Sequence, residues 1–130
     1  MIILDTSATL ALARGHGKLS RVADNAAASP FRHLLVPALC LLQAEIEDAG
    51  SAMSVLALPG VEVEPLDTVS SVTVATMVRD GMGGPDTCHA LYLSLPSPQR
   101  PETDIILTGR EDTYPPGAVT VDIDDKRLDD

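Results

Sequence analysis

The sequence is poor in aromatic and basic residues and contains only two cysteines, Cys40 and Cys88. Phe31, Tyr92 and Tyr114 are its only aromatic residues, so the chain lacks the stacking platform on which many proteins bind single-stranded nucleic acid. The two cysteines are far apart and form no ligand-like pair, which argues against a zinc site and against a disulfide framework.

Positive charge is also scarce, because 9 lysines and arginines stand against 19 aspartates and glutamates, a formal net charge of −10. Such a chain does not attract polyanions by its overall field, so nucleic acid would need a metal or a small local cationic patch. No apolar run approaches the roughly 18 residues of a transmembrane helix. A charge at position five argues against a signal peptide. We therefore expect a cytoplasmic protein with no membrane contact.

The 130 residues, 45% of them hydrophobic, are enough for one domain with an aliphatic core. The patterns predict strands at 2–4, 33–36, 61–64, 104–108 and 118–121. They predict helices at 6–14, 18–29, 38–49, 51–58, 68–80 and 86–95, and a loop rich in proline and serine at 96–101. This alternation predicts an α/β fold, a three-layer αβα sandwich around a parallel sheet of about four to five strands. We expect the domain to span 1–121, followed by an acidic, frayed tail at 122–130.

The first seven residues, Met-Ile-Ile-Leu-Asp-Thr-Ser, run from an apolar strand directly into Asp5. Ligands of open α/β sheets bind beyond the carboxyl ends of the strands, where Asp5 would meet a metal ion or a phosphate. Aspartate is also a preferred helix N-cap, and capping is the commoner role. Asp86 has the same two interpretations, because it opens a helix after the glycine-rich stretch 81–85. A shared cation such as Mg²⁺ would offset the repulsion between the two carboxylates and could activate water for attack on a phosphodiester.

The helix expected at 38–49 carries further candidates beside its apolar stripe. Gln43 and Glu47 are four residues apart and lie on one side of the stripe, whereas Glu45 flanks the other side. Ordinary solvated side chains beside a buried face explain this pattern equally well. His89 follows Asp86 by one turn and could touch the site, although packing is the commoner role of such a histidine.

Four short segments, taken in order, resemble the PIN-domain family, and in particular the small VapC-like toxins of bacterial toxin–antitoxin pairs. They are Ile-Ile-Leu-Asp-Thr-Ser at 2–7, Val-Pro-Ala-Leu-Cys-Leu-Leu at 36–42, Asp-Thr-Cys-His-Ala at 86–90 and Ile-Ile-Leu-Thr at 105–108. The resemblance spans nearly the whole chain. It implies a ribonuclease that holds Mg²⁺ or Mn²⁺ on acidic side chains, forms homodimers and is paired with an antitoxin protein.

The resemblance assigns Asp5 and Asp86 as catalytic residues and metal ligands. Thr6 and Ser7 match the polar residues that follow the first acid, and Thr108 matches the threonine at the end of the fourth strand. These three side chains are therefore expected to neighbour the site.

Two further acidic positions of the family carry other residues in this chain. The glutamate of the helix after the second strand corresponds to Gln43, and the acid two residues after the strand-end threonine corresponds to Arg110. An inward-pointing Arg110 would pair with Asp5 or Asp86 and occupy the place of the metal. Glu47, one turn beyond Gln43, or Glu45, after a shift of register, would supply the missing catalytic carboxylate. Glu111 or Asp112 could do the same beside Arg110.

Three hypotheses follow from the sequence. The first is a metal-dependent ribonuclease of the PIN type. The second is a catalytically degenerate PIN domain that binds a protein partner or RNA without cleaving it, as the replaced acids and the net charge suggest. The third is a phosphate-binding α/β protein that uses the glycine-rich stretch 81–84, although no P-loop lysine follows it.

Overall fold

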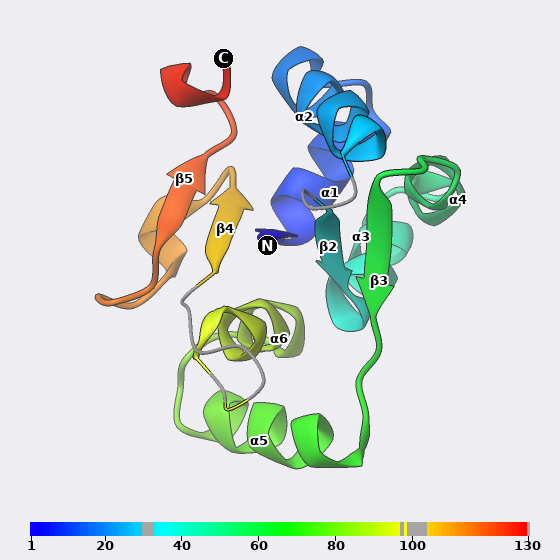
Figure 1. The fold of residues 1–130 in the computed structure, drawn as a ribbon. Helices are drawn as coiled ribbons and strands as arrows, with labels where there is room; N and C mark the ends of the chain where they lie inside the picture. Colours follow the sequence, from blue (N-terminus) through cyan, green and yellow to red (C-terminus); the bar gives the residue numbers. More distant parts are fainter. Residues whose placement is uncertain (30–32, 97, 99–103, 130) are drawn as a thin grey trace.

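The computed structural model describes residues 1–29, 33–96, 98 and 104–129. Phe31 and most of the loop expected at 96–101 lie outside these residues. Five strands form one sheet in the order β3-β2-β1-β4-β5, and every neighbouring pair is parallel (Figure 1). The strands are β1 (Ile2–Leu4), β2 (Leu34–Pro37), β3 (Val61–Glu64), β4 (Ile105–Thr108) and β5 (Thr120–Asp122).

Helices cover both sides of this sheet. They are α1 (Thr6–Ala13), α2 (Gly17–Ala28), α3 (Ala38–Glu47), α4 (Ser51–Leu56), α5 (Thr68–Arg79) and α6 (Pro85–Ser94). In Figure 1, α1 and α2 lie above the sheet, whereas α6 and α5 lie below it. Helix α6 contacts β1, β2 and β4, α5 packs on α6, and α3 and α4 pack along β2 and β3. The predicted three-layer αβα sandwich is confirmed, with element boundaries that differ from the prediction by one or two residues at most ends.

The core is aliphatic, as the composition predicts. Ile3, Leu4, Val36 and Ile106 have no exposed surface, because helices cover both faces of the central strands. The edge strand β3 is instead partly exposed along its whole length. The close packing of α2 against the start of β3 depends on Gly60, where a Cβ atom would lie 2.6 Å from the main-chain nitrogen of Ala27 in α2. Only glycine therefore lets α2 pack this closely against the start of β3.

The prediction of a frayed acidic tail is wrong for residues 123–129. A 3₁₀ helix, η2 (Lys126–Asp129), follows β5 and contacts α2. His16 Nε2 lies 3.0 Å from Asp124 Oδ1, and Lys18 Nζ donates a 2.8 Å hydrogen bond to the main-chain oxygen of Asp124. These contacts at the start of α2 hold the tail on the domain, which acidic composition alone did not reveal.

Among the described residues, no helix has both the length and the apolar surface needed to cross a membrane.

The parallel sheet brings the ends of its central strands to one edge. Leu4 at the end of β1 pairs with Leu107 of β4, and the main-chain nitrogen of Asp5 donates to the Leu107 oxygen at 3.3 Å. Asp5 and Thr108 are therefore neighbours, although they are far apart in the sequence. This carboxyl edge is the place where the fold gathers candidate functional side chains.

Candidate functional site

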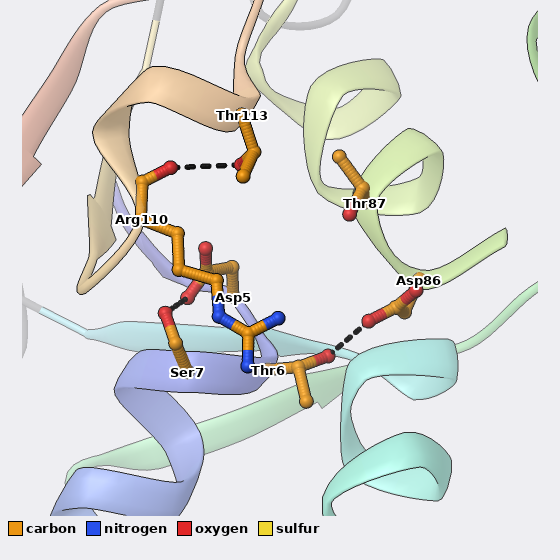
Figure 2. A pocket seen from close by; sticks show the side chains of 7 residues that line it. All are labelled: Asp5, Thr6, Ser7, Asp86, Thr87, Arg110 and Thr113. Atoms are coloured by element: carbon orange, nitrogen blue, oxygen red, sulfur yellow. Dashed lines mark hydrogen bonds between the residues drawn. The ribbon is translucent and has the colours of Figure 1, made fainter. Parts of the chain in front are cut away.

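A small polar pocket of about 60 Å³ opens at the carboxyl edge of the sheet (Figure 2). Three segments supply its walls: the start of α1, the start of α6 and the connection from β4 to β5. The lining residues are Asp5, Thr6, Ser7, Asp86, Thr87, Arg110 and Thr113. The structure thus brings together five of the residues that the sequence analysis selected, together with Thr87 and Thr113, which it did not select.

Asp5 has two roles in the structure. It is the N-cap of α1, where its Oδ1 accepts hydrogen bonds from the Ala8 main-chain nitrogen at 3.0 Å and from Ser7 Oγ at 2.7 Å. Its Oδ2 accepts a 2.6 Å hydrogen bond from the hydroxyl of Tyr114. Asp5 as a whole residue is 6% exposed, and it lines the pocket. The capping role is confirmed, and it does not exclude a role in the site.

Asp86 is not the N-cap of its helix, so that alternative is wrong. Gly84 is the N-cap of α6 and Pro85 takes the first helical position, because its missing N–H costs nothing there. The carboxylate of Asp86 is therefore free of capping, and its Oδ2 accepts a 2.5 Å hydrogen bond from Thr6 Oγ1. This bond joins the starts of α1 and α6 across the pocket (Figure 2).

Cys40 in α3 contacts the start of α6. Its Sγ donates to the main-chain oxygen of Asp86 at 3.3 Å, and its side chain is fully buried in α3. Burial raises the pKa of the Cys40 thiol well above its ordinary value. The thiol therefore stays protonated at neutral pH and is a packing group rather than a nucleophile.

The connection from β4 to β5 is tied to α1 by several hydrogen bonds. Ser7 Oγ accepts from the Gly109 main-chain nitrogen at 2.8 Å and lies 3.3 Å from Thr108 Oγ1. Thr108, which is fully buried, accepts at Oγ1 from the Arg110 main-chain nitrogen at 2.9 Å. Thr108 therefore supports the pocket without lining it, and Ser7 serves both the connection and Asp5.

Arg110 lines the pocket, and Figure 2 shows its side chain extending from the connection between β4 and β5 toward Thr6 at the start of α1. The residue is exposed. Within the described part of the chain, the guanidinium makes no ion pair and no hydrogen bond. From the sequence the direction of Arg110 is open, and only an inward-pointing side chain is expected to pair with Asp5 or Asp86. The side chain does line the pocket, but this ion pair is not formed among the described residues.

The acidic candidates of α3 lie elsewhere. Gln43 Nε2 donates to Glu47 Oε2 at 3.2 Å, which confirms that these two side chains share one side of the helix. Glu45 instead accepts hydrogen bonds from the main-chain nitrogens of Gly50 at 2.7 Å and Ala52 at 3.2 Å. Among the residues that the structure describes, none of the three lines the pocket. The catalytic roles of Glu45 and Glu47 stay predictions.

The pocket offers a divalent cation two carboxylates and several hydroxyl groups. Within the described ranges, no cluster of three or more histidine, cysteine, aspartate or glutamate side chains could hold a metal. Mg²⁺, however, is commonly bound through one or two carboxylates, with water and substrate phosphates completing its shell. Among the described residues, the donors to the Asp5 and Asp86 carboxylates are all neutral. The donor set therefore fits an ion recruited together with a phosphate-bearing substrate, rather than a preformed cage.

Comparisons with known proteins agree with the fold. No family model matches the chain, and no curated protein matches it. Among solved structures, a chain of the DNA-bound VapBC complex from Salmonella typhimurium matches with a TM-score of 0.60 and 16% identity, over 94% of this chain and 97% of that chain. The two chains share a fold. At this identity the likeness to VapBC extends to the α/β architecture alone, and the PIN family stays a prediction for this chain.

Proposed function

We propose that this protein is a PIN-type ribonuclease that hydrolyses RNA phosphodiesters with the help of Mg²⁺ or Mn²⁺. The observation that carries the proposal is the meeting of Asp5 and Asp86 at one pocket on the carboxyl edge of the sheet. Asp5 and Asp86 would hold the ion. When bound, the ion supplies Lewis-acid activation of water and neutralises charge that develops on the phosphate.

The charge of the pocket supports this proposal. Two carboxylates and one guanidinium give the lining a formal charge of −1, so it repels a phosphate by itself. A divalent cation reverses that sign and makes the pocket attractive to a phosphodiester. Metal and substrate would therefore bind cooperatively, which explains how a chain with a net charge of −10 could act on RNA.

Hydrogen bonds from neutral donors fix the orientation of the Asp5 and Asp86 carboxylates. Ser7 and Tyr114 each donate to a different oxygen of Asp5, and Thr6 donates to Asp86. Hydrogen bonds from neutral groups orient a carboxylate without cancelling its charge. The two carboxylates are therefore oriented in advance for a cation, and their hydrogen-bond donors among the described residues bring no opposing charge.

RNA cleavage by the purified full chain tests the proposal. We expect Mn²⁺-dependent cleavage that falls by about a hundredfold or more in Asp5→Asn and in Asp86→Asn, because each variant removes a ligand charge. Asp80→Asn, at the exposed end of α5, removes the same charge away from the pocket and should leave cleavage unchanged. Circular dichroism confirms folding. No cleavage by the wild-type chain would refute the ribonuclease.

A second candidate is a PIN domain that acts by binding and does not cleave. The replacement of two family acids by Gln43 and Arg110 favours it, together with the missing three-acid cluster among the described residues. It predicts no thermal stabilisation by metal. A rise of several degrees in melting temperature with millimolar Mn²⁺, lost in Asp5→Asn, would count against this candidate.

We also propose a protein partner, an antitoxin, and a homodimeric assembly in the cytoplasm. The structural neighbour comes from a DNA-bound VapBC complex, which supports an antitoxin-like partner. Leu42 and Ile46 on α3 are 57% and 67% exposed, and Met53 on α4 is 72% exposed. Large apolar side chains this exposed support a protein interface on these helices. Light scattering of the purified chain measures the assembly, and a monomer would refute the dimer.

A further inference from the structure

We propose that Arg110 is the phosphate anchor of this pocket, and that the pocket binds one phosphate group of an RNA backbone rather than a base. The inference rests on the proposed function, because it assigns a role in substrate binding within the same pocket. It concerns a residue that stands where the family resemblance expects an acid.

The main chain of Arg110 is held by hydrogen bonds on both sides. Its nitrogen donates to Thr108 Oγ1 at 2.9 Å, and its carbonyl oxygen accepts from Thr113 Oγ1 at 2.8 Å. The stretch from Gly109 to Tyr114 is bonded to α1 and its N-cap at both ends, by the hydrogen bond from the Gly109 nitrogen to Ser7 Oγ and by the one from Tyr114 to Asp5. These hydrogen bonds therefore fix the position from which the Arg110 side chain enters the pocket.

The guanidinium group of Arg110 has N–H donors without a partner among the described residues. Within the described residues it has no ion-pair or hydrogen-bond partner, although the carboxylates of Asp5 and Asp86 line the same pocket. A guanidinium that replaced the metal would be paired with one of them. Its fork of N–H donors instead remains open to an incoming oxyanion, and it matches a phosphate with two parallel hydrogen bonds.

The size of the pocket and the chemistry of its walls suit a phosphate group. The volume of about 60 Å³ is small, and the neutral part of the lining consists of hydroxyl-bearing side chains from Thr6, Ser7, Thr87 and Thr113. The hydroxyls of Thr6, Ser7 and Thr113 already donate to Asp86, Asp5 and the Arg110 carbonyl oxygen. Of these four hydroxyls, that of Thr87 is therefore the one whose proton is left for a phosphate oxygen, and such a contact carries no sequence information. Among the described residues no aromatic side chain lines the pocket, so this lining offers no stacking surface for a base.

The experiment measures binding of a single-stranded 2′-O-methyl RNA, which resists cleavage, by fluorescence anisotropy in Mg²⁺. We expect Arg110→Ala to weaken binding by about tenfold, because a charge-assisted contact is lost. The slope of log affinity against log salt should fall in magnitude by about 0.7, the value for one phosphate contact on a single strand. Arg110→Lys should keep the salt slope and lose part of the affinity, because a lysine cannot make the bidentate contact.

A matched control removes an arginine elsewhere. Arg79, exposed at the end of α5, does not line the pocket, so Arg79→Ala should leave both affinity and salt slope unchanged. Oligomers of uridine and of adenosine should bind with affinities within about threefold of each other, since stacking and base contacts are absent. Melting temperatures of all variants verify that the chains are folded.

Several outcomes would overturn the inference. Unchanged RNA binding in Arg110→Ala, or no measurable binding by the wild-type chain, refutes the anchor. Tighter Mn²⁺ binding in Arg110→Ala with RNA binding unchanged would identify Arg110 as a counter-ion in the place of the metal. A strong preference for one base refutes recognition of the backbone. Loss of binding in Arg110→Ala without any cleavage by the wild type would refute the ribonuclease and leave the anchor intact.

Discussion

The hydroxyl of Tyr114 donates a 2.6 Å hydrogen bond to Oδ2 of Asp5, so the connection between β4 and β5 is bonded to the residue that follows the first strand, 109 residues earlier. Burial, and secondarily the charge of Asp5, raises the pKa of Tyr114 well above its ordinary value. The phenol therefore stays protonated at neutral pH and is a constant donor. Both oxygens of Asp5 have a protein partner as a result.

We expect Tyr114→Phe to lower the free energy of unfolding by about 1.5–3 kcal/mol, the range for a hydrogen bond to a charged group. The carboxylate keeps its burial but loses one of its donors. Urea unfolding at pH 7 measures the change. Tyr92→Phe is the control, because the Tyr92 hydroxyl makes no hydrogen bond within the described residues, and it should change stability by less than about 0.5 kcal/mol. Equal effects in both variants would contradict the assignment.

The pKa of Tyr114 also predicts how stability changes at alkaline pH. The unfolded chain releases the phenolic proton near pH 10, whereas the folded chain retains it. Between these two pKa values the folded state binds more protons, so stability falls as the pH rises above about 10. Tyr114→Phe should show a shallower fall than the wild type in urea midpoints measured between about pH 9 and pH 11. Parallel curves would contradict this expectation.

His89 is buried and packs against the start of α3, as the sequence analysis favoured. Its Nδ1 accepts from the Leu39 main-chain nitrogen at 3.3 Å, and its Nε2 has no partner among the described residues. Burial lowers the pKa of His89, although nearby Asp67 opposes the shift. The neutral imidazole is therefore the form that fits the folded protein.

This lowered pKa predicts a loss of stability in mild acid. Below about pH 6.5 the unfolded chain binds a proton at His89 before the folded chain does, so stability falls as the pH falls toward the folded pKa. In His89→Asn an amide oxygen can replace Nδ1 as the acceptor, and the contribution of His89 to this pH dependence should vanish. Melting temperatures between about pH 7.5 and 5.5 measure the difference. An identical acid slope in both proteins would rule out His89 as its source.

Glu45→Gln separates a structural from a catalytic role of this residue. Glu45 accepts hydrogen bonds at the start of α4, so we expect the substitution to lower stability by about 0.5–2 kcal/mol, the range for a lost helix cap. RNA cleavage per folded molecule should persist. Glu47→Gln is the control for stability alone, because Glu47 is exposed and bonded only to Gln43 within the described residues. Loss of cleavage at unchanged stability would instead make Glu45 an acid of the site.

Much of the fold could be predicted from local patterns. Short apolar runs such as 2–4 and 105–108 alternate with helical segments, and a parallel sheet with helices on both sides is the arrangement that buries them all. The ordered structure of the tail could not be predicted, because it depends on the bonds from His16 and Lys18 to Asp124. These bonds join distant segments, and acidic composition does not reveal them. Hydrophobic periodicity is a local property of the sequence, whereas contacts between distant segments are not.

The sequence by itself determined the architecture and the position of Asp5 at the end of the first strand. Only the tertiary structure decided the rest of the site. It excluded the capping role of Asp86 through Pro85, bonded Asp86 to Thr6 and brought Tyr114 to Asp5. It also turned Arg110 into the pocket without an ion pair among the described residues. The physical reason is that hydrophobic periodicity specifies which elements form and which faces they bury, whereas a side-chain hydrogen bond depends on atoms that meet only after those elements have packed.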